Sequence, residues 1–218
     1  MNTALLYQRQ LDILSPEKAE AEEITIIGAG ATGSFTALTL AKMGFKNITV
    51  YDKDNVEMHN LPNQFFPVTC LGENKALALQ ETVEDFTGIK IKAVPEMFED
   101  QKLSGVVISA LDSMKGRKLI FERCIKDKVK LLIDPRAGAQ VLRVFTIDPN
   151  LSFDQSFYKE NWFEDSEGLS TPCTASAIIY SVQAITSFIC NQVKRYVMME
   201  ELKRDIYLDL INNVFFTK

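Results

Sequence analysis

The sequence predicts an α/β protein built on a doubly wound sheet that is mostly parallel, with an antiparallel extension and helices on both faces. Three observations support this fold class. Short apolar runs alternate with segments of helical length along most of the chain. The first apolar run enters a glycine-rich turn that opens a helix. Several runs, such as residues 105–111, are apolar at successive positions, which is typical of strands buried on both faces of a sheet.

The first half of the chain predicts strands and helices in alternation. A short helix is expected within residues 5–20, with Pro16 as its break. A strand at 24–28 and a helix at 31–43 follow, and Gly44 is placed to end that helix. The pattern continues with a strand at 47–52, a helix at 75–86, and strands within 89–98 and at 105–111.

The second half continues the alternation and then changes character. We expect a helix at 115–127, a strand at 130–138 and an antiparallel strand at 141–149. Residues 150–172 are polar and aromatic without clean periodicity, and they predict a long crossing loop. A strong helix at 174–198 and a strand at 204–216 complete the chain, and residues 1–218 are expected to form a single domain.

The composition excludes several classes of protein. A formal net charge of −5 argues against a general nucleic-acid binder. No apolar run reaches the roughly 18 residues of a transmembrane helix, and the charged N-terminal segment does not resemble a signal peptide, so a cytoplasmic protein without membrane contact is expected. The four cysteines form no C-x-x-C pair, which argues against a four-cysteine zinc site. His59 is the only histidine, which disfavours histidine-based catalysis.

The glycine-rich turn predicts a phosphate-binding loop. Gly28, Gly30 and Gly33 follow the first strand with the spacing G-x-G-x-x-G, which brings backbone N–H groups close to a phosphate. The glycines do not distinguish NAD from ATP. Asp52 ends the second strand, 19 residues after Gly33, where an acidic residue binds ribose hydroxyls. An NAD-dependent oxidoreductase is a remote alternative, because the chain shows no substrate domain and no suitable histidine constellation.

The stretch that follows Asp52 is far more specific. Its matching residues are Asp52, Asp54, Val56, Glu57, Asn60, Leu61, Gln64, Gly72, Lys75 and Ala76. They resemble the pattern D-x-D-x-V-E-x-x-N-L-x-R-Q, then G-x-x-K-A, of the ubiquitin-activating-enzyme superfamily, which includes ThiF-, MoeB- and HesA-like adenylyltransferases. Two further motifs of that superfamily are similar to segments here: the Y-x-R-Q at residues 7–10, and Ala110-Leu111-Asp112 with Arg117 on the next helix.

The resemblance implies an ATP-dependent adenylyltransferase that uses Mg²⁺. In this family, the C-terminal glycine carboxylate of a ubiquitin-like or sulfur-carrier protein attacks the α-phosphorus of ATP, and an acyl-adenylate forms. Lys75 would then neutralise phosphate charge, because two anions must meet. Arg9 would reach across a homodimer to the β- and γ-phosphates of the other subunit. Asp112 would hold Mg²⁺ through its carboxylate oxygens.

The same resemblance implies a second set of residues that bind the nucleotide. Asp52 would take the ribose hydroxyls, and Asn60 would contact a phosphate or the substrate carboxylate. Asp54 and Gln64 belong to the same motif, although turn chemistry explains Asp54 equally well. The glycine spacing fits NAD and ATP equally, and the resemblance favours ATP.

One position departs from the family pattern. Asn63 stands before Gln64, where the family usually has arginine, so a positive charge is missing. Arg136, just beyond a strand end, is a candidate to supply the guanidinium instead. If nothing replaces it, the alternative is a non-catalytic nucleotide-binding half of a heterodimeric activating enzyme.

Cys173 is the candidate for a later chemical step. It lies in STPCTASAII, directly before the expected helix at 174–198. A helix N-terminus lowers the pKa of a thiol and raises the thiolate fraction. The segment resembles the catalytic-cysteine segment of enzymes that pass an activated protein to a thiol. The alternative is that Cys173 and Thr174 only cap and pack the helix.

Overall fold

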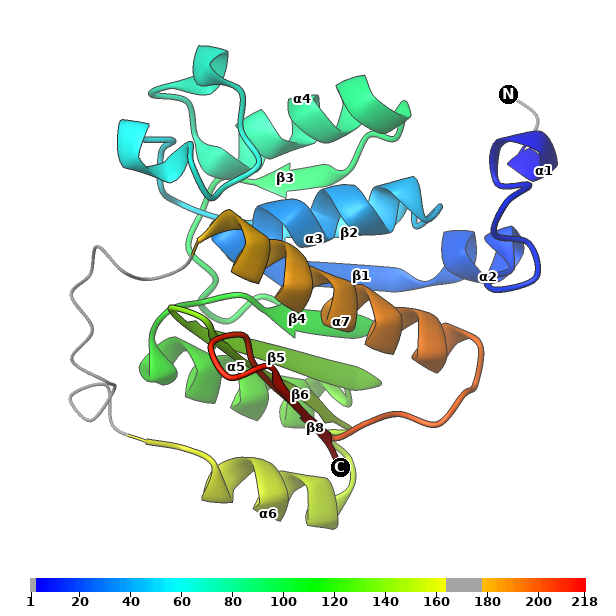
Figure 1. Cartoon of the computed structure of the whole chain (residues 1–218), viewed down its shortest axis with the longest axis vertical. Coiled ribbons are helices and arrows are strands. Elements are labelled where there is room, and N and C mark those ends of the chain that lie inside the picture. Colours follow the sequence, from blue (N-terminus) through cyan, green and yellow to red (C-terminus); the bar gives the residue numbers. More distant parts are fainter. Residues whose placement is uncertain (1–2, 164–177) are drawn as a thin grey trace.

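A computed structural model describes residues 3–163 and 178–218, and its centre is one eight-stranded sheet (Figure 1). The strand order is β3-β2-β1-β4-β5-β6-β7-β8. Neighbours pair in parallel from β3 to β5, and β6, β7 and β8 are added antiparallel. The parallel strands are β1 (Glu23–Ile27), β2 (Asn47–Tyr51), β3 (Lys92–Val94), β4 (Val106–Ser109) and β5 (Leu131–Gly138). The antiparallel strands are β6 (Val141–Ile147), β7 (Asp205–Asp209) and β8 (Val214–Thr217).

Helices pack on both faces of the sheet, which confirms the predicted fold class. One apolar core joins the sheet to α2 (Pro16–Ala21), α3 (Ala31–Lys42), α4 (Lys75–Thr87) and α7 (Ile179–Val197). A second core joins the other face to α5 (Met114–Asp127) and α6 (Ser152–Glu160). The remaining short elements are α1 (Thr3–Leu6) and the 3₁₀ turns η1 (Met58–Asn60) and η2 (Val68–Cys70). None of the helices described has the length and apolar character needed to cross a bilayer.

The strand order fixes where a ligand can bind. From β1 the chain crosses outward to β2 and β3, and then returns to place β4 on the other side of β1. The loops after β1 and β4 therefore leave the same edge of the sheet toward opposite faces. In open α/β sheets this reversal leaves a crevice at the carboxyl ends of the strands.

The prediction of a long crossing loop over residues 150–172 is wrong in its first part, because Ser152–Glu160 form α6. The helix is stabilised by tertiary contacts that local periodicity does not reveal. Tyr158 is fully buried, with its ring centroid 4.9 Å from that of Phe121. The carboxylate of Asp154 accepts hydrogen bonds from the Asp148 N–H, at 3.0 Å, and from Arg204 Nε, at 2.6 Å. Residues 164–177, which include Cys173, lie outside the described part of the chain.

The C-terminal segment also differs from its prediction as one strand over 204–216. It forms a hairpin of β7 and β8. The Asp209 carboxylate accepts hydrogen bonds from the backbone N–H groups of Ile211 and Asn212, at 2.9 and 3.0 Å, and this turns the chain. Asn213 then takes a left-handed φ of 54°, a conformation that asparagine tolerates better than most residues.

Candidate active site

The three glycines of the first loop play different roles. Gly28 has a φ of +102°, and a Cβ there would lie 2.4 Å from the carbonyl oxygen of Ala110. A Cβ on Gly33 would lie 1.8 Å from the carbonyl oxygen of Gly28. Gly28 and Gly33 are thus required by the protein's own packing. A Cβ on Gly30 would meet nothing within 4 Å, and Gly30 is the N-cap of α3, so the space above it is open to a ligand at the helix N-terminus.

Asp52 joins the ends of the first two strands. Its Oδ2 accepts a hydrogen bond from the Ala29 N–H at 2.6 Å, and its Oδ1 accepts one from the Asp54 N–H at 2.8 Å. Burial raises the pKa of the Asp52 carboxyl, and these two N–H groups oppose that shift. The carboxylate is therefore fixed beside the glycine loop.

Two adjoining cavities open at this edge of the sheet. The larger, of about 650 Å³, is bounded by Gly28, Asp52 and Asp112, and much of its wall is apolar, from Ile27, Tyr51, Met97, Phe98, Leu111, Leu119 and Ile120. The smaller, of about 500 Å³, is lined by the polar residues Lys53, Asp54, Asn55, Glu57, His59, Asn60 and Lys75. Lys53 and Asp54 line both cavities. The candidate site therefore consists of a largely apolar cavity beside a polar cavity.

Lys75 is a nearly buried cation in the wall of the polar cavity. It is the first residue of α4 and is 9% exposed, and its Nζ lies 4.0 Å from Asp54 Oδ2. Because this separation is long for a direct hydrogen bond, the ammonium keeps donors for another partner.

Asn74, which is not among the predicted site residues, organises this wall. Its Oδ1 accepts from the N–H groups of Ala76 and Leu77, and its Nδ2 donates to the carbonyl oxygens of Asp52 and Asp54. Asn74 thereby ties the exit of β2 to the start of α4. The signal was present in the sequence, because an asparagine directly before a helical segment is a typical N-cap.

Asn60 and Gln64 occupy different surroundings. Asn60 is buried in η1, lines the polar cavity, and accepts a hydrogen bond from the Glu57 N–H through Oδ1 at 2.9 Å. Gln64 lines neither of the two cavities. Its Oε1 is buried and has no hydrogen-bond partner among the residues described.

Asp112 stands just beyond the end of β4. Its side chain is exposed and lines the larger cavity together with Asp52 and Asp54. Carboxylate oxygens of this kind suit a hard cation such as Mg²⁺. The described residues contain no group of three or more His, Cys, Asp or Glu side chains poised to hold a metal, so a cation at Asp112 would need further ligands from substrate or water.

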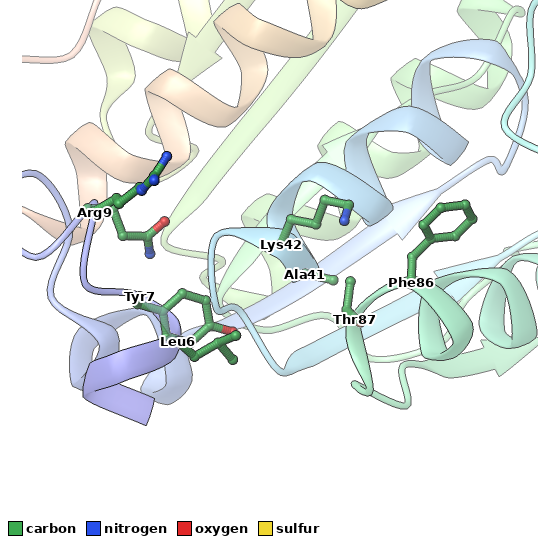
Figure 2. Close-up of a pocket in the computed structure, with 8 residues that line it drawn as sticks. Leu6, Tyr7, Arg9, Ala41, Lys42, Phe86 and Thr87 are labelled. Carbon is green, nitrogen blue, oxygen red and sulfur yellow. The ribbon is translucent and has the colours of Figure 1, made fainter. Parts of the chain in front are cut away.

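Arg9 is placed away from this site in its own chain. It is exposed and lines a separate cavity of about 300 Å³, with Lys42 at the end of α3 and Phe86 and Thr87 at the end of α4 (Figure 2). Gly30 lies at the other end of α3. A helix of 12 residues spans about 18 Å, so Arg9 does not reach the glycine loop of its own chain.

Arg136 lines neither cavity of the candidate site. Its Nε donates to Asp134 Oδ2 at 2.8 Å, and its Nη1 donates to the carbonyl oxygen of Asn161 at 2.7 Å. Its guanidinium also lies 4.4 Å from the ring centroid of Phe145. These contacts direct Arg136 toward α6, and they do not favour its proposed replacement of the missing arginine.

Comparison with known proteins identifies the family. The profile of the ThiF family matches residues 7–210. The chain belongs to the ThiF family. The chain is 27% identical over 164 residues to molybdopterin-synthase adenylyltransferase of Haemophilus influenzae, a match that covers 67% of this chain and 66% of that protein. It is 26% identical over 144 residues to sulfur carrier protein ThiS adenylyltransferase of Bacillus subtilis, covering 61% of this chain and 42% of that one.

A eukaryotic relative matches over a shorter segment. The NEDD8-activating enzyme E1 catalytic subunit of Arabidopsis thaliana is 34% identical over 104 residues, which are 44% of this ThiF-family chain and 23% of that protein. Among solved structures, PaaA superposes with a TM-score of 0.79 at 16% identity, covering 99% of this chain and 72% of that one. E. coli MccB superposes with a TM-score of 0.79 at 12% identity, covering 100% of this chain and 70% of that one. These structures establish the fold.

The glycine geometry predicts opposite outcomes for two alanine substitutions. Gly33→Ala should destabilise the protein by about 1–3 kcal/mol or more, because its Cβ would overlap the Gly28 backbone. Gly30→Ala should leave the melting temperature near that of the unchanged chain and weaken ATP binding, because its Cβ would enter the open space above α3. Thermal unfolding and calorimetry with ATP measure both effects. Unchanged ATP affinity in Gly30→Ala would show that the ligand lies elsewhere.

Proposed function

We propose that this chain is an ATP-dependent adenylyltransferase that activates the C-terminal carboxylate of a ubiquitin-like or sulfur-carrier protein. One observation carries the proposal: an apolar cavity bounded by Asp52 and Asp112 adjoins a polar cavity that contains Lys75. ATP has a matching division, with an apolar base at one end and charged phosphates at the other. Membership of the ThiF family, and relatives named as adenylyltransferases, support the same reaction.

The surroundings of the cavities fit ATP with Mg²⁺. Asp52 would accept the ribose hydroxyls, the bare backbone at Gly30 would approach a phosphate, and Lys75 would neutralise phosphate charge. Asn60 would donate to a phosphate or to the incoming carboxylate. Asp112 would hold Mg²⁺, which supplies additional positive charge to the phosphates when it is bound.

The reaction joins two anions, and this determines which side chains are needed. A carboxylate oxygen of the carrier forms a bond to the α-phosphorus, the bond from that phosphorus to the bridging oxygen breaks, and pyrophosphate leaves with the electron pair. The product is an acyl-adenylate. Preorganised cations lower the barrier because negative charge develops on the phosphates as the bond breaks. Lys75 is held for this task at the N-terminus of α4 by the Asn74 cap.

A second candidate function follows from the position of Arg136. Arg136 pairs with Asp134 and the Asn161 carbonyl, and no arginine is among the described residues that line the two cavities, which supports a site with less positive charge than the family pattern has. A chain with reduced cationic charge could serve as the non-catalytic nucleotide-binding half of a heterodimer. Adenylation assays with the isolated chain separate the two functions.

Asp112→Ala should abolish most of the adenylation. We expect ATP–pyrophosphate exchange that depends on a small protein ending in Gly-Gly, and a decrease of about 10²–10³ in its rate in the variant. Asp85→Ala, an exposed carboxylate of α4 that lines neither cavity, is the control and should match the unchanged chain. No exchange by the unchanged chain, although it binds ATP, would favour the non-catalytic function. Equal rates in both variants would remove Asp112 from the metal-binding role.

Arg9 should complete the ATP site of a second copy in a homodimer. Mixing Arg9→Ala chains with Asp112→Ala chains should restore about half of the activity per mixed dimer, because one of the two sites then has both residues. Mixing the double variant with unchanged chains is the reciprocal control and should give inactive mixed dimers. The reverse pattern, measured on dimers shown to be mixed, would mean that Arg9 acts within its own chain.

Cys173 should act after the adenylate has formed. A thiol attacks only an activated carbonyl, so Cys173→Ala should retain pyrophosphate exchange and lose any thioester-linked carrier. Mass spectrometry of the intact protein with carrier and ATP, before and after treatment with a thiol reagent, measures the adduct. Cys70→Ala, at a buried thiol, is the control. A thiol-sensitive adduct that persists in Cys173→Ala would assign the step to another cysteine.

A further inference from the structure

A buried carboxylate outside the two cavities organises the end of β5. Asp134 is fully buried, and neither cavity of the candidate site includes it. Its Oδ2 accepts hydrogen bonds from Tyr158 Oη and from Arg136 Nε, both at 2.8 Å. Its Oδ1 accepts from Nη1 of Arg117. These three donors offset the cost of burying the Asp134 charge, and the carboxylate in turn fixes the orientation of each donor.

Arg117 links that carboxylate to the loop that carries Asp112. It is nearly buried in α5, and its Nη1 also donates to the carbonyl oxygens of Ser109, at 3.3 Å, and Pro135, at 2.9 Å. Its Nη2 donates to the carbonyl oxygen of Leu111. Ser109 ends β4 and Leu111 immediately precedes Asp112. The planar guanidinium therefore binds both sides of the turn between β4 and Asp112.

The other two donors to Asp134, Tyr158 and Arg136, link its carboxylate to α6. Tyr158 belongs to α6, and Arg136 donates to the Asn161 carbonyl at the C-cap of that helix. Burial raises the pKa of the Tyr158 phenol, so this group stays an O–H donor to the carboxylate. Asp134 is thus the common acceptor for α5, α6 and β5.

None of these four side chains lines the cavities, so their effect on a ligand must pass through the backbone. The neighbours of Asp112 on both sides, Leu111 and Ser113, do line the larger cavity. Ser113 Oγ caps α5 by accepting from the Gly116 N–H at 3.3 Å. The turn is therefore held by Arg117 before Asp112 and by the helix cap after it.

We propose that Arg117 and Asp134 are positioning residues that hold Asp112 in place to bind the Mg²⁺ of Mg·ATP. This inference rests on the proposed role of Asp112 in the nucleotide site. Groups that orient a metal ligand typically change metal affinity by about 10- to 100-fold when they are removed. The effect should therefore appear in the Mg²⁺ dependence of ATP binding, and not in ATP binding alone.

The test is calorimetry of ATP binding to the full chain, with Mg²⁺ and with EDTA. Arg117→Lys keeps the positive charge, but a single ammonium cannot reproduce the fork that binds Asp134 and three carbonyl groups. In the unchanged chain, Mg²⁺ should increase the affinity for ATP. We expect this increase to be smaller by about tenfold or more in Arg117→Lys, as in Asp112→Ala. Its affinity for ATP in EDTA should stay that of the unchanged chain.

Arg143→Lys is the matched control. Arg143 is also paired with an aspartate through two hydrogen bonds, to Asp205 at 2.8 and 2.7 Å, but it lies on β6 and lines neither cavity. It should keep the full gain from Mg²⁺. If Arg117→Lys melts below the assay temperature, Asp134→Asn, which keeps the side-chain shape, replaces it with the same expected result.

The outcomes separate this inference from the proposed function. If the unchanged chain binds ATP with a gain from Mg²⁺ that Asp112→Ala removes but Arg117→Lys and Asp134→Asn keep, the positioning role is wrong and the nucleotide site stands. If the unchanged chain binds no ATP, the proposed function itself is wrong, and this inference fails with it. Loss of the gain in Arg143→Lys as well would show a general structural effect and would also contradict the inference.

Discussion

The candidate site depends on one hydrogen bond, which the Ala29 N–H donates to the Asp52 carboxylate. It joins the loop after β1 to the end of β2, and its 2.6 Å length places the carboxylate directly beside the glycine turn. Asn74 extends the same connection to α4 by donating to the Asp52 carbonyl. Three elements that are distant in the chain are thereby fixed at one edge of the sheet, where the parallel strands end.

Charge is the second constraint on this site. The reaction we propose brings together two anions, but the polar cavity also contains the acidic side chains of Asp54 and Glu57. Lys75 lies 4.0 Å from Asp54, so part of its field is offset before any ligand binds. Lys53 and Lys75 face Asp54 and Glu57 in the walls of this cavity, so the fixed charges are close to balanced and we expect two anions to need further positive charge. Mg²⁺ at Asp112 and Arg9 of a second copy are the sources that we propose.

The sequence predicted the fold class and the grouping of Gly28, Asp52, Asn60, Lys75 and Asp112 around one site. The fold class is confirmed, and these five residues line two adjoining cavities, while their roles in binding stay predictions. Glycine spacing and strand ends are local properties of the sequence, and a parallel sheet brings such positions close together. The helix α6 was not predictable in the same way, since it depends on Tyr158 packing against Phe121 and on Asp134. The orientation of the Arg136 side chain also depends on that helix, because its Nη1 donates to the Asn161 carbonyl oxygen at the helix C-cap. Long-range contacts of this kind leave no periodic signal.

The sequence by itself determined most of the alternation of strands and helices and the glycine-rich turn after the first strand, because both follow from spacing along the chain. Tertiary structure alone decided that Asp134 gathers Arg117, Arg136 and Tyr158 into one buried cluster. It also decided that Arg9 lies beside Lys42, at the far end of α3 from Gly30. The physical reason is that these contacts depend on the distances between elements far apart in the chain. Only the folded sheet sets those distances, and with them the donors that surround a buried carboxylate and the groups that an arginine side chain can reach.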